Sequence, residues 1–232
     1  MFKELFDVFR KGDLLHQAFD RSHEMLRDDM EMVEAAIRSL RERDDARLDI
    51  DVYAKDQRIN AYQREVRRKV FTHLTIASGQ DLHAGLALVS VVIDIERIGD
   101  YAKNIVELAL NHPGRLRCGP HEEMVRRIET TVKTMFSLLL EAMPANDDAK
   151  AKEIMSEHWW IARRGDEIVD ALIQKDEPQL PGREAVASAL YVRYLKRISA
   201  HLMDIASSIA NPFDRIGFRG EDPNGGMKKT EA

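Results

Sequence analysis

Helix-breaking residues are widely spaced in this 232-residue chain, and this spacing restricts the folds that it can adopt. The prolines lie at positions 113, 120, 144, 178, 181, 212 and 223, so the first 112 residues contain none. Because proline interrupts regular backbone hydrogen bonding, long stretches without it favour long helices. Apolar residues recur at helical spacing, and no useful length of chain alternates with a period of two residues. The sequence therefore predicts an all-α fold without a sheet.

The apolar spacing indicates six long helices. They are expected at about residues 15–40, 52–77, 81–111, 125–144, 147–175 and 183–210. Asp13 is suited to cap the first helix, because a short side chain with an acceptor oxygen can bind the free N–H groups of the first turn. Pro144 is expected to end the fourth helix.

Three helices, a break rich in Pro and Gly, and three further helices indicate an internal repeat. The dipeptide Arg-Ile at 97–98 recurs at 197–198, in the third helix of each set. Each set is expected to form an antiparallel three-helix bundle. The expected domains are a first bundle with a short amphipathic N-terminal segment (1–112), a linker (113–120), a second bundle (121–218) and a disordered tail (219–232).

Composition excludes several classes of protein. The net charge of −5 argues against non-specific binding of nucleic acid. The longest uncharged apolar run, 84–93, is much shorter than the roughly 20 residues of a membrane-spanning helix. The charged N-terminus does not resemble a secretory signal, and a single cysteine, Cys118, permits no disulfide within the chain. We therefore expect a cytoplasmic protein without a transmembrane segment.

Three carboxylates fall on apolar helix faces. Glu96 and Asp100 are four residues apart and continue an apolar line, and Asp56 lies between Val52 and Ile59 on another. A buried carboxylate must be protonated, paired with a cation or bound to a metal. Three explanations remain open. The acids could lie at the bundle rim and pair with Arg64, Arg97 or Lys103, could form a metal site, or could act as a catalytic acid–base pair.

A di-iron oxygenase is the most specific enzyme alternative for a helical bundle with inward carboxylates. Such proteins place Glu-x-x-His on two helices. None of the eight histidines has a glutamate three residues earlier, and no Ser/His or Cys/His arrangement suggests a nucleophile. The sequence therefore favours a protein that binds partners over an enzyme.

The run DIERIGDYAKNI at 94–105 resembles the signature of the PhoU family of phosphate-uptake regulators. The segments QDLH at 80–83 and DQRIN at 56–60 resemble two further elements of that family, in the same order. The resemblance extends over about residues 1–216. It implies two similar three-helix bundles and a negative regulator of the phosphate-starvation response.

The resemblance also implies partners and a cofactor. PhoU proteins are thought to link the ATPase subunit of a phosphate ABC importer to a sensor histidine kinase, and they are commonly homodimers that reach the membrane through these partners. Some members bind iron or zinc clusters through a motif that matches Glu96 and Asp100 here, and Asp56 and Asn60 would complete the ligand set. The alternatives are an accessory module of another phosphate permease and a carboxylate-bridged, metal-dependent enzyme.

The second half departs from the family pattern. Lys196 and Ala200 replace the two acids that correspond to Glu96 and Asp100. An ammonium group cannot bind a metal and would repel one. We therefore predict that Lys196 pairs with Asp166 and Asp170, and that an iron or zinc cluster is confined to the first bundle.

Overall fold

The computed structural model describes residues 13–76, 81–174 and 180–218. None of these residues lies in a β-strand, and the long elements are all helices, which confirms the predicted fold class. They are α2 (Leu14–Arg41), α3 (Val52–Ile76), α4 (Leu82–Asn111), α5 (Glu122–Ala145), α6 (Asp148–Gln174) and α7 (Gly182–Ala210). The predicted amphipathic segment (1–12) and disordered tail (219–232) lie outside the described residues.

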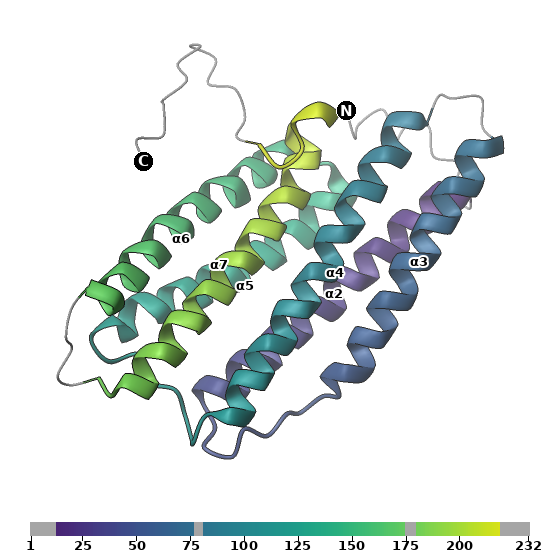
Figure 1. Cartoon of the computed structure of the whole chain (residues 1–232). Helices are drawn as coiled ribbons and strands as arrows, with labels where there is room; N and C mark the ends of the chain where they lie inside the picture. The colour runs from purple at the N-terminus through teal and green to yellow at the C-terminus, as the bar shows by residue number, and fades with distance from the viewer. Residues whose placement is uncertain (1–12, 77–80, 175–179, 219–232) are drawn as a thin grey trace, which may run out of the picture.

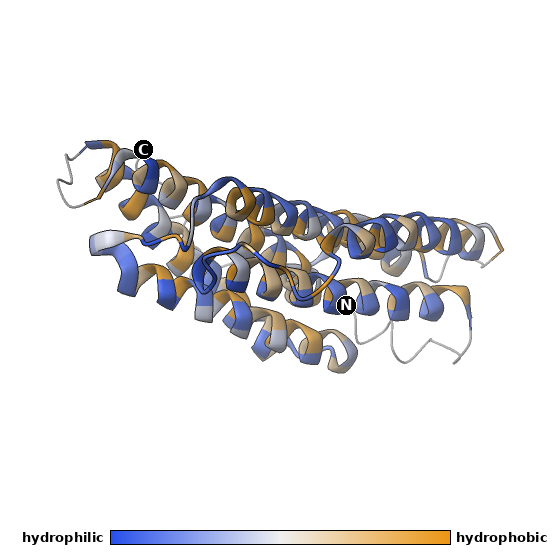
Figure 2. Cartoon of the chain, turned by 90° about the horizontal axis from the view of Figure 1, so that it is seen from below, coloured by the Kyte–Doolittle hydropathy of each residue, from blue (hydrophilic) through white to orange (hydrophobic). Residues whose placement is uncertain are grey.

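The helices pack in two layers. In Figure 1, α6, α7, α4 and α3 lie side by side, with α5 and α2 behind them. Each helix carries hydrophobic and hydrophilic residues on different sides (Figure 2), as expected when one face packs into a core. Within the described ranges, no helix is long and apolar enough to cross a membrane.

The start of α2 follows the sequence expectation. Asp13 has an extended backbone, and its side chain accepts a hydrogen bond of 2.7 Å from the backbone N–H of His16. This bond satisfies one of the amide groups that have no partner at a helix N-terminus. Asp13 is therefore the N-cap of α2, as predicted.

The end of α5 differs slightly from the expectation, because the helix passes through Pro144 and ends at Ala145. Proline has no N–H to donate to the carbonyl four residues earlier, here that of Leu140. The ring of His23 on α2 supplies a replacement, with Nε2 lying 2.8 Å from that oxygen. Asn146 then ends the helix in the left-handed conformation, with φ of 49°. A contact between the bundles thus compensates for a proline that was expected to end the helix.

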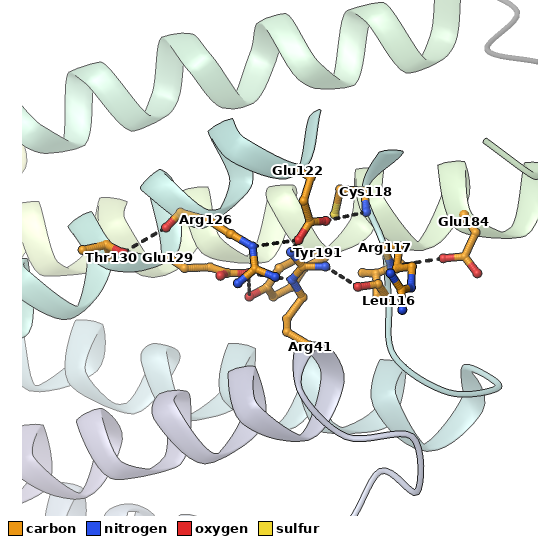
Figure 3. Close-up of polar contacts among 10 residues, drawn as sticks. All are labelled: Arg41, Leu116, Arg117, Cys118, Glu122, Arg126, Glu129, Thr130, Glu184 and Tyr191. Atoms are coloured by element: carbon orange, nitrogen blue, oxygen red, sulfur yellow. Dashed lines mark hydrogen bonds and ion pairs between the residues drawn. The ribbon is translucent and has the colours of Figure 1, made fainter. Parts of the chain in front are cut away.

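A buried arginine joins the two bundles (Figure 3). Arg41, at the end of α2, has only 4% of its side chain exposed. Its guanidinium donates to Glu129 at 2.8 Å, to Glu122 at 2.7 Å, and to the carbonyl oxygen of Leu116. The hydroxyl of Tyr191 on α7 also donates to Glu129, at 2.9 Å. Side chains from both bundles and a backbone carbonyl of the connection between them therefore share one polar network.

The segment predicted as a linker, 113–120, packs against the body of the protein. Leu116 and Cys118 are buried in the core, and the backbone N–H of Leu116 donates to the carbonyl oxygen of Leu40 at 2.9 Å. The N–H of Cys118 donates to Glu122 at 3.0 Å. The connection is thus held at both bundles.

Candidate functional site

The four residues predicted as metal ligands lie on two neighbouring helices. Asp56 and Asn60 are one turn apart on α3, and Glu96 and Asp100 are one turn apart on α4, so each pair shares a helix face. The side-chain amide of Asn60 donates to Asp56 at 3.2 Å. Asp56 is among the charges that raise the pKa of Glu96, which places the two helix faces near each other. The structure therefore brings the predicted residues into one acidic cluster.

Two cations from α4 pair with this cluster. The ammonium of Lys103 lies 2.9 Å from Asp56 and 3.0 Å from Asp100, so it stands between these two carboxylates. Arg97 lies 3.2 Å from Asp100 and 3.8 Å from Glu96. Pairing with Lys103 and Arg97, one of the three explanations drawn from the sequence, is thus present in the structure.

The sequence analysis missed a fifth member of the cluster. Asp29 on α2 is completely buried, and neither of its carboxylate oxygens has a hydrogen-bond partner in the described part of the protein. A Cβ atom at Gly99 would lie 3.0 Å from Asp29 and 3.8 Å from Asp56, so Gly99 of α4 packs closely against both carboxylates. The position of Asp29 on the apolar line of its helix, between Leu26 and Val33, was the signal available in the sequence.

Burial raises the pKa of two acids in the cluster. The pKa of Asp29 is held well above its ordinary value by burial first, and then by the neighbouring charges of Asp28 and Asp56. The pKa of Glu96 is also raised, by burial and by the charge of Asp100. Both shifts have the same cause, since low-polarity surroundings and like charges disfavour the ionised form. Additional positive charge at the cluster would lower both pKa values toward their ordinary values.

The charges leave room for a cation. When ionised, Asp29, Asp56, Glu96 and Asp100 carry four negative charges, against two positive charges on Lys103 and Arg97. Carboxylate oxygens are ligands for hard and borderline metals, and Asp29 has the unpartnered oxygens that such an ion would use. The donor chemistry therefore fits a divalent cation, although its entry between Asp56 and Asp100 requires the ammonium of Lys103 to move aside.

On the corresponding surface of the second bundle, a lysine pairs with one of the two acids. The ammonium of Lys196 on α7 lies 2.5 and 2.7 Å from the two carboxylate oxygens of Asp166 on α6. This ion pair confirms the first half of the sequence prediction. The predicted pairing of Lys196 with Asp170 is wrong for the described structure, because these two side chains make no ion pair. A positive side chain thus occupies the place that a metal would need.

A family model described as the PhoU domain matches the chain twice, at residues 22–109 and 125–209. The chain belongs to the PhoU family. Each match covers most of one bundle and nearly all of its motif helix, so the repeat inferred from the sequence is also a repeat of the PhoU domain.

Relatives of known name and structure agree with this assignment. A phosphate-specific transport system accessory protein PhoU homolog from Synechocystis sp. is 24% identical over 88% of this chain and 85% of its own length. Its counterpart in Caulobacter vibrioides is 27% identical over 68% and 70% of the two chains.

Two crystal structures share the fold. PhoU from Streptococcus pneumoniae matches with a TM-score of 0.66 and 19% identity, over 84% of this chain and 91% of that one. PhoU from Pseudomonas aeruginosa matches with a TM-score of 0.62 and 22% identity, over 90% and 97%.

The acidic cluster can be tested by metal removal. We expect protein loaded with iron or zinc to lose the metal held by this cluster when Glu96 and Asp100 are both replaced by alanine, because two of the four carboxylates disappear. Metal content by mass spectrometry measures the effect. The Asp166→Ala variant of the second bundle is the matched control and should keep its metal. Equal metal content in the double variant and the unmodified protein would contradict the assignment.

Proposed function

We propose that this PhoU-family protein is a regulatory adaptor that links the ATPase subunit of a phosphate ABC importer to a sensor histidine kinase, and that it damps the phosphate-starvation response. The observation that carries the proposal is the double match to the PhoU domain, which extends through both bundles. The names of the relatives support the coarser part, since they describe accessory proteins of phosphate-specific transport systems. Such an adaptor would act in the cytoplasm, and we expect it to be a homodimer.

The distribution of exposed apolar side chains supports a role with two partners. The first apolar tip, where α3 ends and α4 begins, carries Phe71, Ile76, Leu82 and Leu86. The second apolar tip, where α6 ends and α7 begins, carries Ile173, Val186 and Leu190. These two tips lie at opposite ends of the protein in Figure 1. Large exposed apolar side chains are typical of binding surfaces, so one body could hold two partners apart.

The proposal gives the acidic cluster a structural role rather than a catalytic one. An enzyme needs a concave pocket with an open position beside its reactive groups. One cavity in the described part of the protein, of about 330 Å³, is lined by Arg41, Arg115, Leu116, Arg117, Gly119, Glu122 and Arg126. None of these residues belongs to the acidic cluster. A cation bound by the acidic cluster would hold α2, α3 and α4 together.

Binding measurements with purified partners test the adaptor. The full chain should bind both the ATPase subunit and the cytoplasmic part of the kinase from the same organism. Replacing Phe71 and Ile76 with serine should weaken one partner at least about tenfold, and replacing Ile173 and Val186 should weaken the other, because tenfold corresponds to about 1.4 kcal/mol of lost apolar contact. Biolayer interferometry gives both affinities.

Tyr53→Ser provides the control for this experiment. Tyr53 is exposed and apolar, but it lies at the opposite end of α3 from Phe71. Its replacement should leave both affinities unchanged. Failure of the unmodified protein to bind either partner would overturn the proposal, and binding to a different phosphate permease alone would favour the alternative of an accessory module for that permease.

A further inference from the structure

A second group of ligand-type side chains lies between the two bundles, away from the acidic cluster. Asp94 comes from α4, and His201 and Asp204 come from α7. Each residue offers one ligand atom, and these three atoms lie within 4.8 Å of one another. In the described part of the protein, no other group of three His, Cys, Asp or Glu side chains is as compact. The carboxylates of the acidic cluster are therefore more widely spread than this group.

Helix geometry explains why the two sites are separate. Asp94 and Glu96 are two residues apart, which places them on different sides of α4. Glu96 lies on the side that α3 covers, with Asp56 nearby, whereas Asp94 faces α7 and contacts His201. On α7, His201 and Asp204 are three residues apart and share a face. Helix α4 thus contributes one carboxylate, and the facing side of α7 contributes an imidazole and a second carboxylate.

The imidazole of His201 is held in place from two directions. Its Nδ1 atom lies 3.0 Å from Asp94, and its ring stacks on Tyr101 with centroids 5.8 Å apart. The guanidinium of Arg197 lies 3.5 Å from Nε2 and donates to the hydroxyl of Tyr101 at 3.2 Å. Only 9% of the His201 side chain is exposed. The stacking on Tyr101 limits rotation of the His201 ring, whereas a metal ion on either ring nitrogen requires Arg197 to move away from Nε2.

Two carboxylates and one guanidinium surround the imidazole of His201. Asp94 and Asp204 are negative when ionised, and Arg197 is the neighbouring positive charge. A histidine binds a metal in its neutral form, and the two carboxylates then face one guanidinium. Crowding of two partly buried carboxylates beside one imidazole is the arrangement that a divalent ion relieves.

The chain folds back over Asp204 just after α7. Gly217 has φ of +85°, and a Cβ atom there would lie 3.2 Å from the Asp204 carboxylate. The N–H of Gly217 donates to the hydroxyl of Ser207 at 2.7 Å, which holds this backbone in place. The cover limits the space beside Asp204, so a small ion fits there better than a larger ligand.

We propose that Asp94, His201 and Asp204 form a site for one divalent transition-metal ion, with Zn²⁺ the best match, which links α4 of the first bundle to α7 of the second. One imidazole and two carboxylates are ligands that Zn²⁺ accepts, and water would fill the remaining position. Metal–ligand distances of about 2.0–2.2 Å place tetrahedral ligand atoms roughly 3.4 Å apart. The three ligand atoms, which lie within 4.8 Å of one another, would reach this spacing through small side-chain rotations.

Titration with Zn²⁺ and Co²⁺ tests the site in the full chain, after metal removal and in the Glu96→Ala, Asp100→Ala background that lacks the first cluster. We expect one ion per chain by calorimetry, and a visible Co²⁺ spectrum. His201→Gln and Asp204→Asn should each weaken Zn²⁺ binding at least tenfold. The matched control is His73→Gln, because His73 also pairs with an aspartate, Asp81 at 2.8 Å, and should leave binding unchanged.

X-ray absorption on the Zn²⁺-loaded background protein gives a second readout that needs no further variant. One imidazole in the first shell is expected, since the acidic cluster contains no histidine. Absence of binding in the background protein would overturn the proposal. So would unchanged affinity in both His201→Gln and Asp204→Asn, or a ligand shell made only of oxygen.

Discussion

Replacing Arg41 with alanine should lower the free energy of unfolding by about 3–5 kcal/mol, the cost typical of removing one partner from a buried ion pair. The loss is large because Glu129 would stay buried without its cation, and the carbonyl of Leu116 would lose its donor. Among the described residues, Tyr191 would be the one remaining donor to Glu129. Urea denaturation followed by circular dichroism measures the change.

Arg126→Ala is the control for this prediction. Arg126 pairs with Glu122 at 2.9 Å, but it is exposed and lies four residues away on the same helix. Such pairs contribute about 0.3–0.5 kcal/mol, so this variant should unfold almost as the unmodified protein does. A loss below about 1 kcal/mol in Arg41→Ala would show that the network in Figure 3 does not stabilise the contact between the bundles.

Asp29→Asn should make the metal-free protein more stable at neutral pH and reduce the pH dependence of its stability. Because burial raises the pKa of Asp29, the folded protein keeps this proton at pH values where the unfolded chain has released it. The free energy of unfolding therefore falls as the pH rises from about 3.9, the ordinary value, to the raised value. This contribution reaches about 1.4 kcal/mol per pH unit within that window, and asparagine removes it.

Urea denaturation between pH 5 and 8, in the presence of a chelator, checks this second prediction. Asp20→Asn is the matched control, because Asp20 lies on the same helix but is exposed. Its replacement should leave the slope of stability against pH close to that of the unmodified protein. A steeper decline in Asp29→Asn, or lower stability at pH 7, would mean that the buried carboxylate is compensated in a way that the described contacts do not contain.

Features that follow from helical periodicity or from the internal repeat could be predicted from the sequence. The spacing of apolar residues located the helices, and the internal repeat placed Lys196 opposite Asp166 by analogy with Glu96 and Asp56. Asp29 was visible as an acid on an apolar line, but the orientation of α2 toward Gly99 is a property of packing between helices. Periodicity in the sequence shows which face of a helix is buried, but it does not show which neighbouring helix packs against that face.

Contacts between the bundles were not accessible in this way. Arg41 and Glu129 are separated by 88 positions, and His201 and Asp94 by 107. Neither separation follows from the repeat, because each pair joins residues that do not correspond between the two halves. Pro144 shows the same limit, since its effect on α5 depends on His23 from another helix. These long-range pairs require the relative placement of the bundles.

The ion pair between Lys196 and Asp166 makes the second half of the protein an internal reference for the first. Both halves have the same helical framework and both carry a lysine beside their acids, but Lys103 lies between two carboxylates of the first half, whereas Lys196 pairs with a single carboxylate in the second. Ionic strength, pH and added salts act on both halves at once. A response to a divalent ion that appears on α3 and is missing on α6 can therefore be assigned to the acidic cluster within a single sample, without comparing two preparations.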